Sequence, residues 1–109
     1  MANKFDLIIT IVNKGYSDYV IDAAREAGAS GGTVIYGLGT SKNSETFLGV
    51  AIHPEKEIIL TVVKHNEKDK IMQTISERSN LNSNGHGICF SLPTSNVVGI
   101  ANMLKDSDK

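Results

Sequence analysis

Apolar and polar residues alternate along several short segments of the chain, which is the pattern of β-strands. In residues 5–12 every second residue from Phe5 to Ile11 is apolar, while the residues between them are mixed. One face of this segment is therefore wholly apolar, which predicts a central strand. Further strands are expected where β-branched and apolar residues gather, at 33–36, 57–64 and 88–92, with shorter ones at 46–48 and 50–52.

Two segments carry apolar residues at helical spacing. Between residues 16 and 27 the apolar positions recur every three or four residues, and charged residues occupy the other face. We expect Ser17 to be the N-cap and Gly28 to end this helix, because glycine accepts a positive φ. A second helix is expected to begin at Asn66 as its N-cap, with a narrow apolar stripe of Ile71, Met72 and Ile75.

The predicted order is β-α-β-loop-β-α-β, which is a ferredoxin-like βαββαβ fold of the α+β class. Right-handed crossovers place both helices on one face of a four-stranded antiparallel sheet. We assign Ile8, Val12, Ile59 and Val63 to the opposite face. Because these side chains are too apolar to remain in water, we expect other subunits to cover them in a homo-oligomer.

The length indicates a single domain over residues 1–109. We expect a flexible loop at about 40–54 and a frayed tail at about 105–109. The segment 97–104 fits either a helix or a short edge strand.

Charge and cysteine content exclude several classes of protein. The chain has 11 Lys and Arg against 12 Asp and Glu, so it lacks the basic excess of a nucleic-acid-binding protein. Its single Cys89 cannot form an internal disulfide, which fits a reducing compartment and predicts a cytoplasmic protein. The apolar run from Leu7 to Val12 is far shorter than the roughly 20 residues that a membrane-spanning helix needs.

The sequence contains no pattern typical of catalysis. There is no Ser-x-x-Lys or Gly-x-Ser-x-Gly segment, and Cys89 falls in the middle of a predicted strand. His53, His65 and His86 lie on separate segments, without the spacing of a metal site. We therefore expect neither an enzyme nor a resident metal, although a metal-binding trimer remains an alternative.

Glycine is the residue type whose distribution calls for an explanation. Six of the ten glycines lie between positions 28 and 49, and two Gly-x-Gly segments flank predicted strands: Gly37-Leu-Gly39 and Gly85-His-Gly87. Consecutive backbone N–H groups in such loops can hold an anion, because no Cβ blocks its approach. The same glycines can also serve only to shape turns, so a ligand-independent trimeric adaptor is the second hypothesis.

From Phe5 to about Ile100 the chain resembles the PII signal-transduction proteins, the nitrogen regulatory superfamily, as a divergent PII-like member. The resemblance rests on Arg25-Glu-Ala-Gly28, Gly31-Gly-Thr-Val34 and the two Gly-x-Gly segments, the second of which continues to Phe90. It implies homotrimers of ferredoxin-like subunits. Clefts between the subunits bind adenine nucleotides, and the large loop engages the regulated target.

The resemblance also implies a site that is divided between two subunits. Ile11 and Thr33 border the adenine, and residues 37–42 lie near the phosphates. The segment 85–87 comes from the neighbouring subunit. The implied ligand-binding residues are Ile11, Gly31, Thr33, Gly37, Gly39, Thr40, Ser41, Lys42, Gly85, His86 and Gly87.

The chain departs from the classical PII pattern at its charged positions. Thr40-Ser41 replace a basic residue and Gln, Ile88 replaces a Lys, and no Arg follows Arg78. A triphosphate would therefore lose most of its charge-assisted partners, so we expect AMP, ADP or a cyclic nucleotide as effector in preference to ATP. The loop 40–54 contains no Tyr to be modified. The partner implied by the resemblance is a membrane transporter or a metabolic enzyme.

Overall fold

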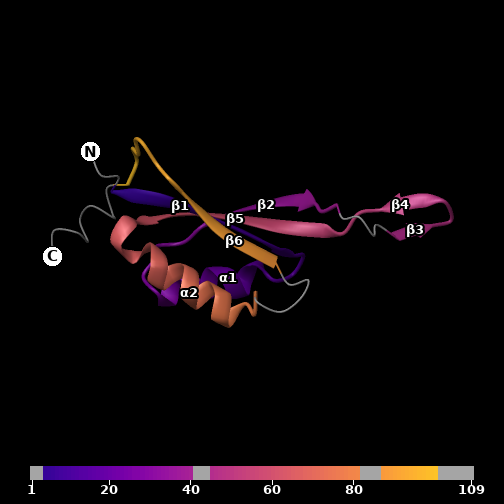
Figure 1. The fold of residues 1–109 in the computed structure, drawn as a ribbon, viewed down its shortest axis with the longest axis horizontal. Coiled ribbons are helices and arrows are strands. Elements are labelled where there is room, and N and C mark those ends of the chain that lie inside the picture. Colours follow the sequence, from indigo (N-terminus) through magenta and orange to yellow (C-terminus); the bar gives the residue numbers. More distant parts are fainter. Residues whose placement is uncertain (1–3, 41–44, 82–86, 101–109) are drawn as a thin grey trace.

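The computed structural model describes residues 4–40, 45–81 and 87–100, and in 45–47 and 51–52 only the backbone. Figure 1 shows the elements. In chain order they are β1 (Phe5–Asn13), α1 (Ser17–Glu26), β2 (Thr33–Leu38), β3 (Glu45–Phe47), β4 (Val50–Ile52), β5 (Glu55–Lys64), the 3-10 turn η1 (His65–Glu67), α2 (Lys68–Arg78) and β6 (Gly87–Pro93).

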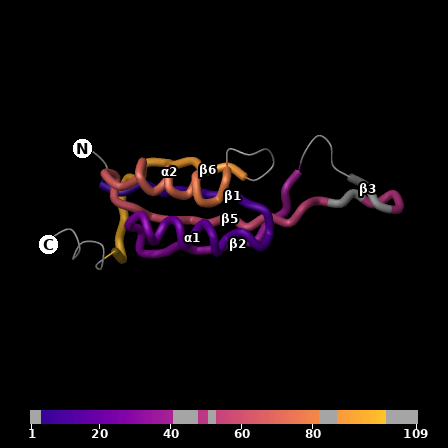
Figure 2. Tube along the Cα trace, turned by 90° about the horizontal axis from the view of Figure 1, so that it is seen from below, coloured from indigo at the N-terminus to yellow at the C-terminus, as the bar shows by residue number. Residues whose placement is uncertain are grey.

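Four of the strands form one antiparallel sheet in the order β2-β5-β1-β6. Both helices lie on the same side of this sheet, side by side (Figures 1 and 2). The arrangement is the ferredoxin-like βαββαβ fold, with the β3–β4 hairpin inserted between β2 and β5. The predicted fold class and strand order are therefore confirmed.

The hydrophobic core lies between the sheet and the helices. Ile8, Val12, Ile59 and Val63 are fully buried there, against apolar residues of the helices that include Val20, Ala23, Ala24, Ile71 and Ile75. Our assignment of the four strand residues to the uncovered face was wrong. They point toward the helices, because the helices cover the mixed face of β1 and leave its wholly apolar face outside.

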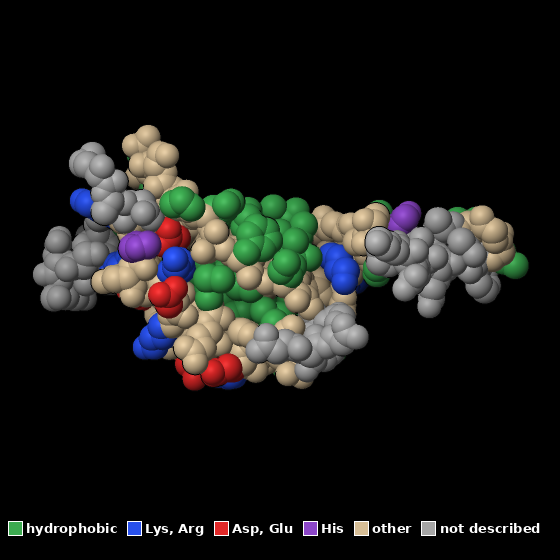
Figure 3. All heavy atoms as spheres, in the orientation of Figure 1, with side chains coloured by type: hydrophobic (Ala, Val, Ile, Leu, Met, Phe, Trp, Pro, Cys, Tyr) green, Lys and Arg blue, Asp and Glu red, His purple; other side chains and the backbone are tan. Residues whose placement is uncertain are grey.

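The opposite face, which we call the outer face, is apolar across all four strands of the sheet. Residues of the two central strands are half-buried, and those of the edge strands are exposed. Figure 3 shows hydrophobic side chains gathered over the sheet in the middle of the molecule. The register places the following residues on the outer face: Leu7, Ile9, Ile11, Ile35, Ile58, Leu60, Val62, Ile88, Phe90 and Leu92. The expectation of a covering subunit rests on this face.

A carboxylate from β5 caps the first helix, in place of the predicted Ser17 side chain. Glu57 is buried, and its Oε1 accepts hydrogen bonds from the backbone N–H groups of Gly15 (2.8 Å) and Ser17 (3.0 Å). Burial acts to raise the pKa of Glu57, but the hydrogen bonds from Ser17, Gly15 and Tyr16 outweigh it and lower the pKa. Ser17 is thus the first helical residue and no N-cap.

The other end of α1 follows the expectation from sequence. Gly28 has a φ of 120°, and its N–H donates to the Arg25 carbonyl while that of Ala29 donates to Ala24. These two bonds form a Schellman motif, which requires a residue that accepts positive φ.

The start of α2 differs from the prediction. Asn66 lies inside η1, and the helix begins only at Lys68, with no side-chain cap. The histidine that opens this turn, His65, contacts the buried Asp6 through Nδ1 and Oδ2, 2.6 Å apart. Contacts with β1 therefore set the course of the chain here. Residues 94–100 form neither helix nor strand, and the predicted frayed tail lies outside the described residues. In the described part neither helix is long and apolar enough to span a membrane.

A two-stranded hairpin, β3 and β4, projects from one end of the sheet (Figure 1). We call residues 45–52 the arm. Leu48 and Gly49 form its turn with φ values of 52° and 81°, the two positive values of a type I′ turn. The central part of the predicted flexible loop 40–54 is thus a paired hairpin, whereas residues 41–44 lie outside the described residues.

The core assignment predicts the effect of removing a buried side chain. Ile59→Ala should lower the free energy of unfolding by about 2–5 kcal/mol, because it leaves a cavity between the sheet and the helices. The matched substitution Val98→Ala, at a side chain that is 93% exposed, should change it by less than about 0.5 kcal/mol. Urea unfolding measures both, and equal losses would contradict the assignment.

The Glu57 cap predicts a dependence of stability on pH. The pKa is lowered in the folded state, so the stabilisation is complete above the ordinary pKa of 4.5 and is lost as pH falls through the folded value. Glu57→Gln should therefore be less stable than wild type at about pH 7 and should approach it at about pH 3 in urea unfolding. The control Glu77→Gln, on the exposed side of α2, should keep the wild-type pH dependence. An unchanged pH dependence in Glu57→Gln would contradict the assignment.

Candidate ligand-binding site

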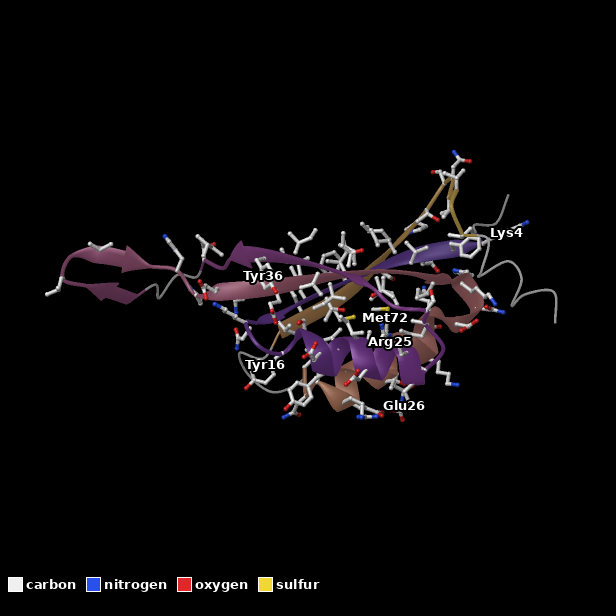
Figure 4. The ribbon with its side chains drawn as sticks, turned by 180° about the vertical axis from the view of Figure 1, so that it is seen from behind. Lys4, Tyr16, Arg25, Glu26, Tyr36 and Met72 are labelled. Carbon is white, nitrogen blue, oxygen red and sulfur yellow. The ribbon has the colours of Figure 1, made fainter. Side chains whose placement is uncertain are left out.

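A cleft of about 610 Å³ lies at the base of the arm. The turn from β1 into α1, the end of β2 and the start of β5 meet there. Figure 4 shows Tyr16 and Tyr36 at this end of the molecule, at the start of α1 and on β2. The cleft is lined by Lys14, Gly15, Tyr36, Gly37, Leu38, Glu55, Lys56 and Glu57.

The strand register relates this cleft to the second Gly-x-Gly segment. Val12 pairs with Gly87 on one side and with Glu57 on the other, and Glu57 pairs with Tyr36. Gly37 and Gly87 therefore lie at the same end of the sheet but on opposite edges, about 14 Å apart by strand spacing. Within one chain Gly37 and Gly87 therefore do not meet. If the β2 edge of one subunit lay beside the β6 edge of the next, Gly37 of the first would lie close to Gly87 of the second.

The remaining predicted site residues are spread over the sheet. Ile11 lies on β1 between Ile58 and Ile88, on the outer face. Thr33 shares that face but begins β2, at the opposite end of the strand from Gly37, and Gly31 precedes it. Gly39 and Thr40 follow β2 directly. The other four predicted residues, Ser41, Lys42, Gly85 and His86, lie outside the described residues.

Positive and negative side chains are balanced in the cleft. Lys14 Nζ lies 2.9 Å from Glu55 Oε2, and the hydrogen bond and charge of Glu55 raise the pKa of Lys14. Lys56 Nζ instead donates to the neutral amide oxygen of Asn13 at 2.6 Å. Among the described lining residues, Lys56 is thus the cation that is bonded to a neutral group. It can neutralise one anionic group of a ligand.

The start of α1 offers no anion site in this cleft. Its N–H groups at Gly15 and Ser17 already donate to the carboxylate of Glu57, which also satisfies the positive end of the helix dipole. Sequence reasoning placed Lys14 near the phosphates together with Lys42, but it missed Glu57 and Lys56. For Glu57 a signal existed, since a carboxylate on an inward position of an apolar strand needs a hydrogen-bonding partner.

Two of the predicted glycines have a structural role of their own. At Gly87 the φ is 146°, and an added Cβ would lie 2.4 Å from the Ile11 carbonyl oxygen. At Gly39 an added Cβ would lie 2.8 Å from Lys56 Cε, and its N–H donates to the Pro54 carbonyl at 2.7 Å. Gly37 is less constrained, because its Cβ would meet only Ile58 Cδ1 at 3.3 Å.

A nucleophile or metal site is not found in the described part of the chain. Burial raises the pKa of the Cys89 thiol, although a hydrogen bond from Thr10 acts to lower it, so the thiol stays protonated. No three His, Cys, Asp or Glu side chains of the described residues gather where they could hold a metal.

Comparison with known proteins agrees with this architecture. The family model described as nitrogen regulatory protein P-II matches residues 5–102. Among solved structures, Arabidopsis thaliana PII bound to citrate is similar, with 27% identity, 91% of this chain and 82% of that chain covered, and a TM-score of 0.66. No curated protein matches the chain. Because the family model spans nearly all of the sequence, the chain belongs to the P-II family, whose members are regulatory proteins and not enzymes.

Proposed function

We propose that the chain forms a homotrimer, binds an adenine-containing nucleotide in the clefts between subunits, and controls a partner protein through residues 40–54. The observation that carries this proposal is the position of Gly37 and Gly87, one from each Gly-x-Gly segment, at one end of the sheet but on opposite edges. Such a site is incomplete in one subunit and becomes complete when the β2 edge of one chain lies beside the β6 edge of the next.

The outer face supports the assembly. A contiguous apolar surface that crosses four strands is the kind of patch that marks an interaction site. The side chains at its margins, such as Ile35 and Phe90, are exposed in the single chain and would become buried between subunits.

The cleft favours a ligand with little charge. Of its two lysines, Lys14 is already paired with Glu55, so Lys56 is the described lining cation left for an anionic group. This supports AMP, ADP or a cyclic nucleotide in preference to ATP. The similar Arabidopsis protein is bound to citrate, so this tricarboxylate is the competing anion to test.

The base of the arm connects the ligand to the partner. Lys56 uses one of the three donors of its ammonium group for Asn13, which leaves two for a ligand. A bound anion would therefore add to the contact between β5 and the turn after β1, and would favour one arrangement of the arm over others. By its family, the protein that the arm controls is a membrane transporter or a metabolic enzyme.

The close contact at Gly87 favours a second candidate function. If the glycines serve only to let strands approach, the protein is a trimeric adaptor that needs no ligand. Gly37→Ala separates the two functions, because the new methyl group would meet only Ile58 Cδ1, at 3.3 Å, which a small shift of that side chain accommodates. Circular dichroism should confirm that the fold is kept. A loss of nucleotide binding with the trimer preserved supports the ligand-binding function, whereas the adaptor shows no binding to lose.

The assembly is tested by light scattering. The wild-type protein should have three times the 11.7 kDa mass of one chain. Ile35→Glu should lower this mass with unchanged circular dichroism, since the side chain is exposed in the single chain but would face another subunit. Lys70→Glu, exposed on α2 and therefore on the opposite side of the sheet from the outer face, should remain trimeric. A monomeric wild-type protein would contradict the proposal.

The ligand is tested by calorimetric titration of the trimer with AMP, ADP, cyclic AMP, ATP and citrate. AMP, ADP or cyclic AMP should bind more tightly than ATP. Lys56→Gln should weaken binding by roughly 1.5–3 kcal/mol, which is the range for hydrogen bonds to charged groups. Lys70→Gln on the exposed side of α2 is the control and should bind as wild type. Absence of heat with every nucleotide would sink the nucleotide site.

A further inference from the structure

The turn of the arm presents an apolar side chain to solvent. Leu48 is 89% exposed and Val50, two residues later, is 67% exposed. The sequence from Thr46 to Ile52 contains no charged residue at all. A hairpin that is uncharged and largely apolar beyond Glu45 and projects from a folded domain is an aggregation hazard unless something covers it when the protein acts.

The backbone of the turn adds a second cost at the same residue. Leu48 has a φ of 52°, a left-handed conformation that glycine and asparagine adopt readily and leucine does not. In a type I′ turn the favoured pair is Asn-Gly, and here Leu48 precedes Gly49. Leucine is thus unfavourable both for the turn and for solvation. Its presence is explained if its side chain has a use outside the chain.

The described features argue against two other occupants. The strands β3 and β4 have three residues each, too few for a stable sheet between the arms of two copies. Insertion into a lipid surface commonly relies on Trp, Tyr, Lys or Arg, and the sequence from Thr46 to Ile52 contains none of these. With these two occupants set aside, the arm would bind another protein by placing a single apolar side chain in a pocket of that protein.

We propose that Leu48 is the anchor through which the arm binds its partner, and that the partner is a protein with an uncharged, apolar pocket that accepts this side chain. The inference rests on the proposed role of residues 40–54 in partner control. It adds which residue of the arm the partner recognises and by what chemistry. The partner would bury one leucine, and would not need a charged or modified side chain.

The partner is first identified by photo-crosslinking in the cells from which the chain comes. A photo-reactive phenylalanine analogue replaces Leu48 in the full chain, and the same analogue replaces Asp69, whose side chain is 97% exposed on α2, as the control. A protein adduct formed only from position 48 is expected. Adducts to lipid or to another copy of this chain, or no specific adduct, would overturn the proposal.

The captured protein is then purified and its affinity is measured for matched variants. Leu48→Asn supplies the favoured Asn-Gly turn while it removes the apolar anchor, so a loss of binding cannot come from a damaged hairpin. Burial of a leucine is worth about 1.5–3 kcal/mol, so we expect roughly ten- to one-hundred-fold weaker binding. Val98→Asn, at a side chain that is 93% exposed outside the arm, should bind as wild type.

A third variant replaces residues 45–52 by a Gly-Ser linker. It distinguishes a failure of the Leu48 anchor from a failure of the arm as the partner-binding segment. If the linker variant loses binding but Leu48→Asn does not, the arm binds the partner and the leucine anchor is wrong. If neither variant loses binding, the proposed role of the arm itself fails. Loss in both variants, with Val98→Asn unaffected, supports the anchor.

Discussion

The structure depends on one constraint: its central sheet is apolar on both faces. Two helices cover the mixed face, where they bury Ile8 and Ile59, and no further element of the described chain is available for the other. Burial of apolar area is the dominant favourable term in association, so the uncovered face favours contact with further copies of the chain. It also explains why a ligand site at the edges of the sheet can be shared between chains.

A second group of interactions holds the base of the arm, where ligand binding and partner binding would be coupled. The Glu57 carboxylate joins β5 to the turn before α1, and two residues earlier Glu55 pairs with Lys14 of the same turn. Between them Lys56 reaches Asn13 on the other side of the strand. Three consecutive residues at the start of β5 thus contact the end of β1 and the turn that follows it. Because β5 continues directly from the arm, any group that binds Lys56 acts on the base of the arm.

Local patterns in the sequence were enough to predict much of the fold. Strand alternation, helical spacing and Gly28 gave the order of elements, because each signal depends on residues close together in the chain. The side of the sheet that faces the helices could not be deduced, since both faces of β1 are largely apolar. The caps were wrong at Ser17 and Asn66 because a distant carboxylate and a 3-10 turn replaced the local side chains.

The candidate site was only partly predictable for the same reason. The glycine segments are visible in the sequence, but Lys14 and Lys56 become neighbours of Gly37 only through the pairing of strands that are far apart in the chain. A count of basic residues after the glycines predicted a site with few cations, and that stays a prediction. It could not show that Lys14 is already paired with Glu55, which is a property of the folded register.

Lys56 lies just beyond the base of the arm and Leu48 lies at its tip. Regulation would require that ligand binding at the base change the free energy of partner binding at the tip. A ligand shifts the arm only by the difference between its affinities for two arrangements of the base. Under the proposed function Lys56 would supply such a difference, because its contact with Asn13 joins the start of β5 to the end of β1. At the other end, an exposed leucine in a left-handed turn makes the free arm costly to maintain. A partner that buries this leucine recovers the cost of its exposure, so binding at the tip and order at the base favour the same arrangement.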